Sequence, residues 1–104
     1  AYLNAYTYYK TGKYKSAIVA FKNALKQYPE SKRREEIMYL IVDSGYRLAS
    51  NSISEKQTDR YLSMLDSYLS FKEEFPESTH IKSLDRMAQQ ARDYLDRNNK
   101  DNNI

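Results

Sequence analysis

One histidine and two pairs of adjacent glutamates are the side chains whose types could support catalysis or bind a metal. His80 is the sole histidine, and a lone imidazole supplies only one of the ligands that a metal site requires. Neither Glu35–Glu36 nor Glu73–Glu74 converges on a substrate, because adjacent helical residues point about 100° apart. The sequence has no cysteine, Gly-rich phosphate loop or nucleophile motif. We therefore predict no catalytic residues, no metal site and no cofactor.

Tyrosine is the residue type that stands out, with 11 copies against three phenylalanines and no tryptophan. A tyrosine combines an apolar ring with a polar hydroxyl, so it suits half-buried grooves and interfaces. Tyr2, Tyr6 and Tyr9 fall at i, i+4 and i+7, which places them on one face of a helix. This face is the first candidate for binding a partner.

The composition is that of a single water-soluble domain, with 40% hydrophobic and 30% charged residues. The 17 cations and 14 anions are interspersed, which gives no basic patch for nucleic acid. No apolar run approaches the roughly 18 residues that a membrane span needs, so we predict no direct membrane insertion. The chain opens on Ala1, inside an expected helix, and we expect a fragment or processed product of a longer protein.

Amphipathic helical patterns cover most of the chain, and glycine and proline are scarce. The helices are expected at about residues 1–10, 13–28, 32–49, 55–74 and, after a Ser78 or Thr79 cap, up to Arg97. Residues 98–104 lack periodicity, which predicts a disordered tail after a single domain at 1–97.

Three local features lead to further expectations. Ser54 and Gln57 can form a capping box at the start of the fourth helix. Gly45 lies inside the third helix, where glycine costs about 1 kcal/mol relative to alanine, so we expect another helix to approach closely there. The cations at 32–34 form either a solvated turn or a polar contact at an interface.

An internal repeat organises these helices. Tyr-Pro-Glu-Ser at 28–31 and Phe-Pro-Glu-Ser at 75–78 each end one amphipathic helix and start the next. Aligning the two segments also places Tyr14 on Tyr61. Such a repeat indicates stacked supersecondary units, each of which buries its apolar face against the next.

The first unit resembles the tetratricopeptide repeat through Tyr8, Gly12, Tyr14, Ala17, Phe21, Ala24 and Pro29. The resemblance implies an all-α, tetratricopeptide-like α-solenoid of five antiparallel helices, arranged as two helix pairs plus a C-terminal capping helix. The second unit departs from the pattern, because Met64 and Phe71 replace the small Ala17 and Ala24. The loop at 50–58 also stretches the period beyond the usual 34 residues or so.

A narrower resemblance rests on the stretches AIVAFKNALKQYPESKRREEIMYLIVDSGYRLA and YLSMLDSYLSFKEEFPESTHIKSLDRMAQQARDYL. They are similar to repeats of the BamD-like lipoproteins of the outer-membrane β-barrel assembly machine. The resemblance implies the C-terminal part of such a protein, in the periplasm and held at the outer membrane by an upstream lipid anchor. It implies protein partners, namely the periplasmic domain of the barrel insertase or smaller accessory lipoproteins.

Other classes stay open at this point. A general tetratricopeptide adaptor that binds peptides would have the same helix pairs. The YPxS ending also occurs in other periplasmic repeat proteins, such as the cell-division coordinator of the Tol system. An accessory or regulatory domain of an enzyme is a third class, and it would need a ligand-shaped pocket with convergent polar groups.

In the tetratricopeptide pattern, the tyrosine-bearing face of the first helix in each pair lines the concave groove. We therefore predict that the partner-binding residues are Tyr2, Tyr6, Tyr9, Lys10, Tyr39 and Tyr46. Such a groove could hold an extended peptide or a helix of a partner. The alternative is that these rings pack against an upstream repeat that precedes this sequence.

Overall fold

The computed structural model describes residues 1–102, which form five α-helices and no strand. The helices are α1 (Tyr2–Lys10), α2 (Tyr14–Gln27), α3 (Arg34–Ser50), α4 (Ser54–Glu74) and α5 (Ile81–Asn102). The all-α, tetratricopeptide-like fold expected from the sequence is thereby confirmed. Among the described residues, no helix has the length and apolar character that crossing a membrane would require.

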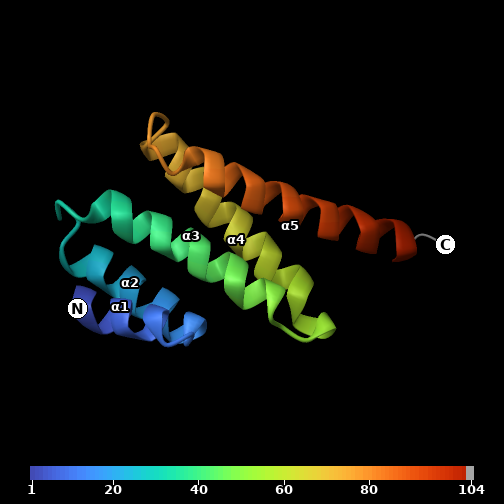
Figure 1. The fold of residues 1–104 in the computed structure, drawn as a ribbon, viewed down its shortest axis with the longest axis horizontal. Coiled ribbons are helices and arrows are strands. Elements are labelled where there is room, and N and C mark those ends of the chain that lie inside the picture. The colour runs from blue at the N-terminus through green and yellow to red at the C-terminus, as the bar shows by residue number, and fades with distance from the viewer. Residues whose placement is uncertain (103–104) are drawn as a thin grey trace.

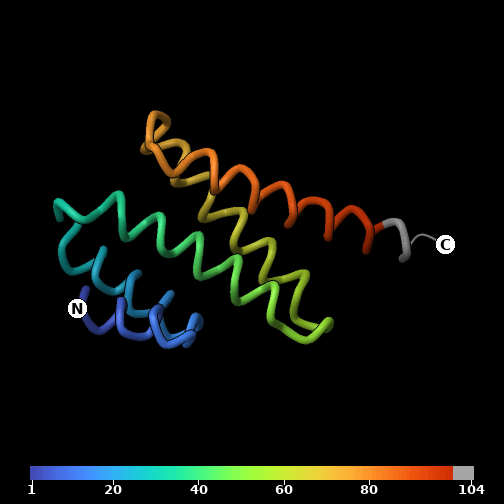
Figure 2. The backbone as a smooth tube through the Cα atoms, in the orientation of Figure 1, coloured from blue at the N-terminus to red at the C-terminus, as the bar shows by residue number. Residues whose placement is uncertain are grey.

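Each helix packs on the one before it, with short connections that reverse the chain direction (Figure 1). In addition, α3 contacts α5, so α1, α3 and α5 form one layer while α2 and α4 form the other. The molecule measures 48 × 28 × 19 Å. The trace in Figure 2 shows the α1–α2 pair at one side and α5 at the opposite side. The central helix α3 is therefore covered from several directions, which suits its nearly all-round apolar pattern.

The two Pro-Glu-Ser junctions have the same local hydrogen bonds. Ser31 Oγ accepts a hydrogen bond from the backbone N–H of Arg33 at 3.1 Å. Ser78 Oγ accepts one from the N–H of His80, also at 3.1 Å. Because α5 begins at Ile81, neither Ser78 nor Thr79 directly precedes the helix, and the predicted cap at one of them is wrong. The Ser78 side chain instead shapes the turn before the helix. The repeated sequence thus specifies a repeated turn.

The capping box predicted for Ser54 and Gln57 is wrong. Ser54 is already the first helical residue, Ile53 occupies the cap position, and no side chain caps this helix end. The Gln57 amide instead reaches back and donates to the carbonyl of Ala49 at 3.0 Å. The bond ties the start of α4 to the end of α3, which holds the short loop between them.

Gly45 lies where the expected close approach occurs. A β-carbon at this position would stand 3.3 Å from the Cβ of Met64 on α4. Real Cβ contacts are seldom that short, so the missing side chain lets α3 and α4 pack closely. Gly12 has a different role, because its φ of +78° makes the left-handed turn between α1 and α2.

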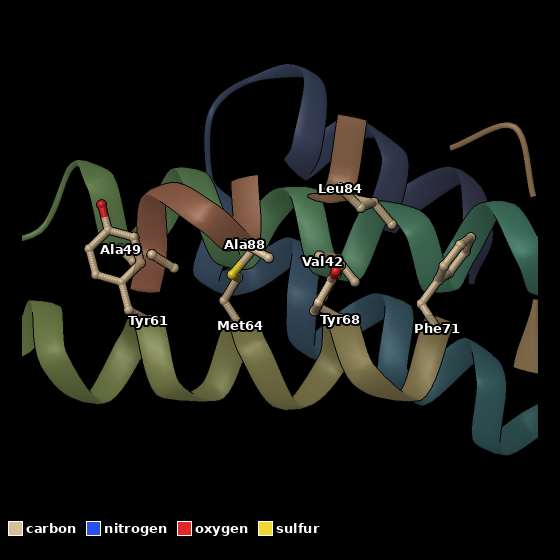
Figure 3. Close-up of a cluster of buried hydrophobic side chains, with 9 residues drawn as sticks. Val42, Ala49, Tyr61, Met64, Tyr68, Phe71, Leu84 and Ala88 are labelled. Carbon is tan, nitrogen blue, oxygen red and sulfur yellow. The ribbon is translucent and has the colours of Figure 1, made fainter. Parts of the chain in front are cut away.

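Two hydrophobic clusters form the core. One joins α1, α2 and the first half of α3 through Ala5, Ala17, Phe21, Ala24, Ile37, Leu40 and Ile41. The other, shown in Figure 3, joins α3, α4 and α5 through Val42, Ala49, Tyr61, Met64, Tyr68, Phe71, Leu84, Ala88 and Ala91. Phe21 and Phe71 are fully buried, one in each cluster. Each helix pair therefore has its own core, and α3 contributes to both.

The last helix is longer than the sequence indicated. We expected it to end near Arg97, with disorder over 98–104, but α5 continues to Asn102. No proline or glycine follows Arg97 to stop a helix there. Residues 103–104, the rest of the expected tail, lie outside the described residues.

Candidate partner-binding surface

The six residues predicted to bind a partner lie on the layer formed by α1, α3 and α5, and we call this surface the tyrosine face. On α1, the rings of Tyr2 and Tyr6 stack with centroids 5.9 Å apart, and those of Tyr6 and Tyr9 with centroids 6.1 Å apart. Lys10 Nζ lies 5.5 Å from the Tyr6 ring centroid. The structure therefore gathers the four α1 residues into one continuous stack.

The two tyrosines of α3 face α5. Tyr39 stacks on the imidazole of His80 with centroids 3.8 Å apart. The Tyr46 hydroxyl donates to the side chain of Gln90. Tyr39 also packs against the same buried cluster as the α1 tyrosines, so it connects the two parts of the face. All five rings are half-buried rather than standing free in solvent.

Hydroxyl groups of this face link neighbouring helices. Tyr2 donates to Glu36 Oε2 at 3.0 Å, and Tyr9 donates to Asp43 Oδ2 at 2.5 Å. Both bonds connect α1 to α3, as the Tyr46 bond connects α3 to α5. The tyrosines thus hold the helices of this layer together in addition to presenting ring edges at the surface.

Asp43 is the central residue that sequence reasoning missed. Its side chain is 1% exposed, and its Oδ2 also accepts a hydrogen bond from Arg47 Nε at 2.9 Å. A buried carboxylate needs such donors, because desolvating an unpaired charge is very costly. One signal in the sequence could have revealed it. Tyr9 and Asp43, like Tyr2 and Glu36, are 34 residues apart, which matches the usual tetratricopeptide period.

The electrostatics of this network favour neutral tyrosines. Burial, followed by the hydrogen bond to Asp43, raises the pKa of Tyr9 far above its ordinary value of 10.0. Burial and Glu36 raise the pKa of Tyr2 in the same direction. The hydrogen bond to Asp43 raises the pKa of Arg47. At ordinary pH, Tyr2 and Tyr9 therefore stay protonated and donate hydrogen bonds, and they do not transfer protons.

His80 has a structural setting at the start of α5. Besides stacking on Tyr39, its ring lies edge-on to Phe71 with centroids 6.5 Å apart. Within residues 1–102, no group of three or more His, Cys, Asp or Glu side chains is placed to hold a metal ion. The imidazole thus contributes to packing among α3, α4 and α5.

The cations at 32–34 were left open between a solvated turn and a polar contact. Arg34 makes a two-pronged pair with Glu74 on α4, including an Nη2–Oε1 distance of 2.9 Å. Nearby, Ser78 Oγ donates to Glu35 Oε2 at 2.8 Å. Arg33 lies over the Tyr2 ring, 4.5 Å from its centroid. The start of α3 is therefore joined to the second junction by polar contacts within the chain.

A comparison with protein families identifies the chain. Its residues 1–100 match the family model YfiO, described as an outer membrane lipoprotein. No curated protein gives a significant match to the chain. The family match includes both helix pairs, both Pro-Glu-Ser junctions and the whole tyrosine face. The chain therefore belongs to the YfiO family of BamD-like outer membrane lipoproteins, as the resemblance of its repeats implied.

Proposed function

We propose that this chain is a non-catalytic scaffold of the outer-membrane β-barrel assembly machine. It binds protein partners through preformed surfaces of its helical repeats. Membership of the YfiO family supports a periplasmic location at the outer membrane. We further propose that a lipid anchor upstream of these repeats provides the attachment to the membrane.

The observation that carries this proposal is the internal bracing of the tyrosine face. The hydroxyls of Tyr2, Tyr9 and Tyr46 are held by side chains of the next helix in the layer. Ring positions fixed in this way lose little conformational entropy when a partner binds. Tyrosine is also enriched among the residues that dominate binding energy at protein interfaces.

The partner contacts would come from ring edges and from one cation. Tyr6 lies between Tyr2 and Tyr9 in the stack, and Lys10 is exposed beside it. A partner with an apolar side chain and an acidic neighbour would complement this arrangement. We propose that the partner is the periplasmic domain of the barrel insertase or an accessory lipoprotein of the same machine.

The test measures binding of the purified periplasmic domain of the insertase, and separately of the accessory lipoproteins, to the intact protein. We expect Tyr6→Ala combined with Tyr46→Ala to weaken binding at least about tenfold, because each change removes a central aromatic contact. Circular dichroism of the variant should retain its helicity. Tyr8→Ala is the matched control, because Tyr8 is on α1, is 39% exposed and lines a cleft beside α2 instead.

Two results would contradict the proposal. One is unchanged affinity in the Tyr6→Ala/Tyr46→Ala protein for every partner that the unchanged protein binds. The other is an equal loss of affinity with Tyr8→Ala. The first result would favour the alternative that the tyrosine face packs against an upstream repeat. The second would show that the loss of affinity does not come from the tyrosine face.

A further inference from the structure

A second surface lies on the other side of α3, where an apolar groove runs between α2 and α4. Two clefts of about 210 and 280 Å³ form it, and they share Lys22, Ile41 and Ser67. The floor is apolar, with Ile41, Gly45 and Leu48 from α3. Val19 at the rim is 56% exposed. We call this surface the α2–α4 groove.

Helix geometry separates the groove from the tyrosine face. At 100° per residue, Tyr39 and Tyr46 lie on one side of α3, and Ile41 and Leu48 lie on nearly the opposite side. The lining residues of both clefts include none of the predicted partner-binding residues. The groove is therefore a distinct surface, and a ligand bound there would leave the tyrosine face accessible.

Small side chains keep the groove open. Ser63, Ser67 and Ser70 line its α4 wall at i, i+4 and i+7. The floor from Met38 to Leu48 extends about 15 Å at 1.5 Å per helical residue. That length matches about five residues of extended chain at 3.3 Å each. The dimensions therefore suit a short extended segment of another protein.

The charges along the rim indicate the chemistry of that segment. Lys15, Lys22 and Arg60 line the first cleft, and its lining contains no carboxylate. None of these three cations makes an ion pair with another of the described residues. Arg60 donates instead to the neutral hydroxyl of Ser52 at 2.5 Å. These cations can therefore attract carboxylates of a ligand without first breaking an internal pair.

We propose that the α2–α4 groove binds an extended, acidic segment of a protein partner. Apolar side chains of the segment would rest on Ile41 and Leu48, and its carboxylates would face Lys15, Lys22 and Arg60. Asp66 lines only the second cleft, so carboxylates of the ligand that lie in the first cleft meet no acidic side chain of its lining. This inference is independent of the tyrosine face.

The experiment uses the intact protein and a labelled seven-residue peptide that alternates leucine with aspartate. In an extended peptide, this pattern places apolar and acidic side chains on opposite faces. Fluorescence anisotropy should detect binding that weakens as salt is raised, because rim charges are screened. We expect Lys15→Glu combined with Lys22→Glu to weaken binding at least about tenfold. Ser67→Leu should weaken it similarly by filling the groove.

Matched controls separate the groove from general charge and folding effects. Lys13→Glu combined with Lys26→Glu makes the same charge change at exposed positions that line neither cleft. Thr58→Leu is the control for Ser67→Leu, because Thr58 is exposed on α4 and lines neither cleft. Both controls should bind the acidic peptide as the unchanged protein does. Tyr6→Ala should also leave this binding unchanged, which distinguishes failure of this inference from failure of the tyrosine face.

Several outcomes would overturn the proposal. They are no binding of the acidic peptide, equal binding of a leucine–lysine peptide, or equal loss with the matched controls. Concentration-dependent self-association abolished by Ser67→Leu would assign the groove to a second copy of the chain. Binding to phosphatidylglycerol vesicles without binding to the acidic peptide would assign the cations to a lipid surface.

Discussion

In the α1–α2 pair, the repeat positions that face the neighbouring helix are Ala17 and Ala24, whereas α4 has Met64 and Phe71 at the aligned positions. All four side chains are buried. The larger Met64 fits because α3 has Gly45 opposite it, with no Cβ to clash. The two pairs therefore reach close packing by different means, with small residues in one helix or a missing side chain in the partner helix.

The tyrosine hydrogen bonds that connect α1 to α3 and α3 to α5 also differ from each other. Tyr9 reaches an acceptor 34 residues ahead, whereas Tyr46 reaches one 44 residues ahead. Seven of the ten extra residues come from α4, which has 21 residues where α2 has 14. The other three arise because Tyr46 lies farther from the end of its helix than Tyr9 does. The junction turns are repeated closely, but helix length and core residues are not. Turn chemistry is thus the conserved part of this internal repeat.

The largest expected effect compares the two core phenylalanines. Phe21→Ala and Phe71→Ala should each destabilise the protein by about 3–5 kcal/mol, because each ring is fully buried and leaves a cavity. Denaturant melting followed by circular dichroism measures the cost. A change near zero for Phe21→Ala would contradict the core assigned to the first pair.

The next effect compares a buried carboxylate with an exposed one that has a similar partner. Asp43 accepts from Tyr9, and Asp85 accepts from Tyr68 at the same distance of 2.5 Å. Asp43→Ala should cost about 1–3 kcal/mol, because it leaves the half-buried hydroxyl of Tyr9 without its acceptor. Asp85→Ala should cost less, since the Asp85 side chain is 47% exposed and water replaces it. Equal costs in thermal melts would refute this ranking.

A double-mutant cycle tests the compensation between Gly45 and Met64. Gly45→Ala alone adds a Cβ against Met64, and this clash offsets the gain of about 1 kcal/mol in helix propensity. In a Met64→Gly background the Cβ at position 64 is absent, so the clash is relieved and the same change should become stabilising. We expect a coupling free energy of about 1 kcal/mol. Additive effects would mean that the close approach is unimportant.

A smaller effect distinguishes the two junction serines. Ser31→Ala and Ser78→Ala each remove an acceptor for a turn N–H, at a cost of roughly 0.5–1.5 kcal/mol. Ser78→Ala should cost more, because Ser78 also donates to Glu35. Chemical denaturation of the two variants measures the difference. The reverse order would show that the Ser78–Glu35 bond contributes little.

The smallest effect is a pH dependence at the second junction. The hydrogen bond from Arg34 lowers the pKa of Glu74 below its ordinary value of 4.5. A lowered carboxyl pKa contributes stability above the unfolded value, and this contribution is lost as pH falls through the folded value. Arg34→Met should therefore lower the free energy of unfolding at pH 7 by less than about 1 kcal/mol, since the Arg34–Glu74 pair is partly exposed. At pH 2 the two proteins should differ less, and a larger difference there would contradict the assignment.

The sequence was sufficient to predict the features that depend on local pattern. Helix periodicity and the breakers Gly12, Pro29 and Pro76 predicted five helices and their order, which the structure confirms. The close approach at Gly45 was predicted because a mid-helix glycine needs a steric reason. These features follow from short-range stereochemistry, which a single sequence expresses directly.

Features that depend on distant partners could not be predicted in the same way. Asp43 looks like an ordinary polar residue until Tyr9 and Arg47 are brought to it by the packing of α1 on α3. The contact between Gln57 and Ala49 likewise requires the loop geometry between α3 and α4. The α2–α4 groove depends on the spacing of three helices, so no local pattern reveals it.

Site-specific photo-cross-linking in cells tests the scaffold function most directly. A photoreactive residue at Lys10, beside the tyrosine stack, is compared with one at Lys26 on α2, which is also exposed. The full-length lipoprotein should form an adduct with the barrel insertase or an accessory lipoprotein from Lys10 and not from Lys26. If mass spectrometry finds no component of the assembly machine at Lys10, or the same adducts from both positions, the proposed role of the tyrosine face is contradicted.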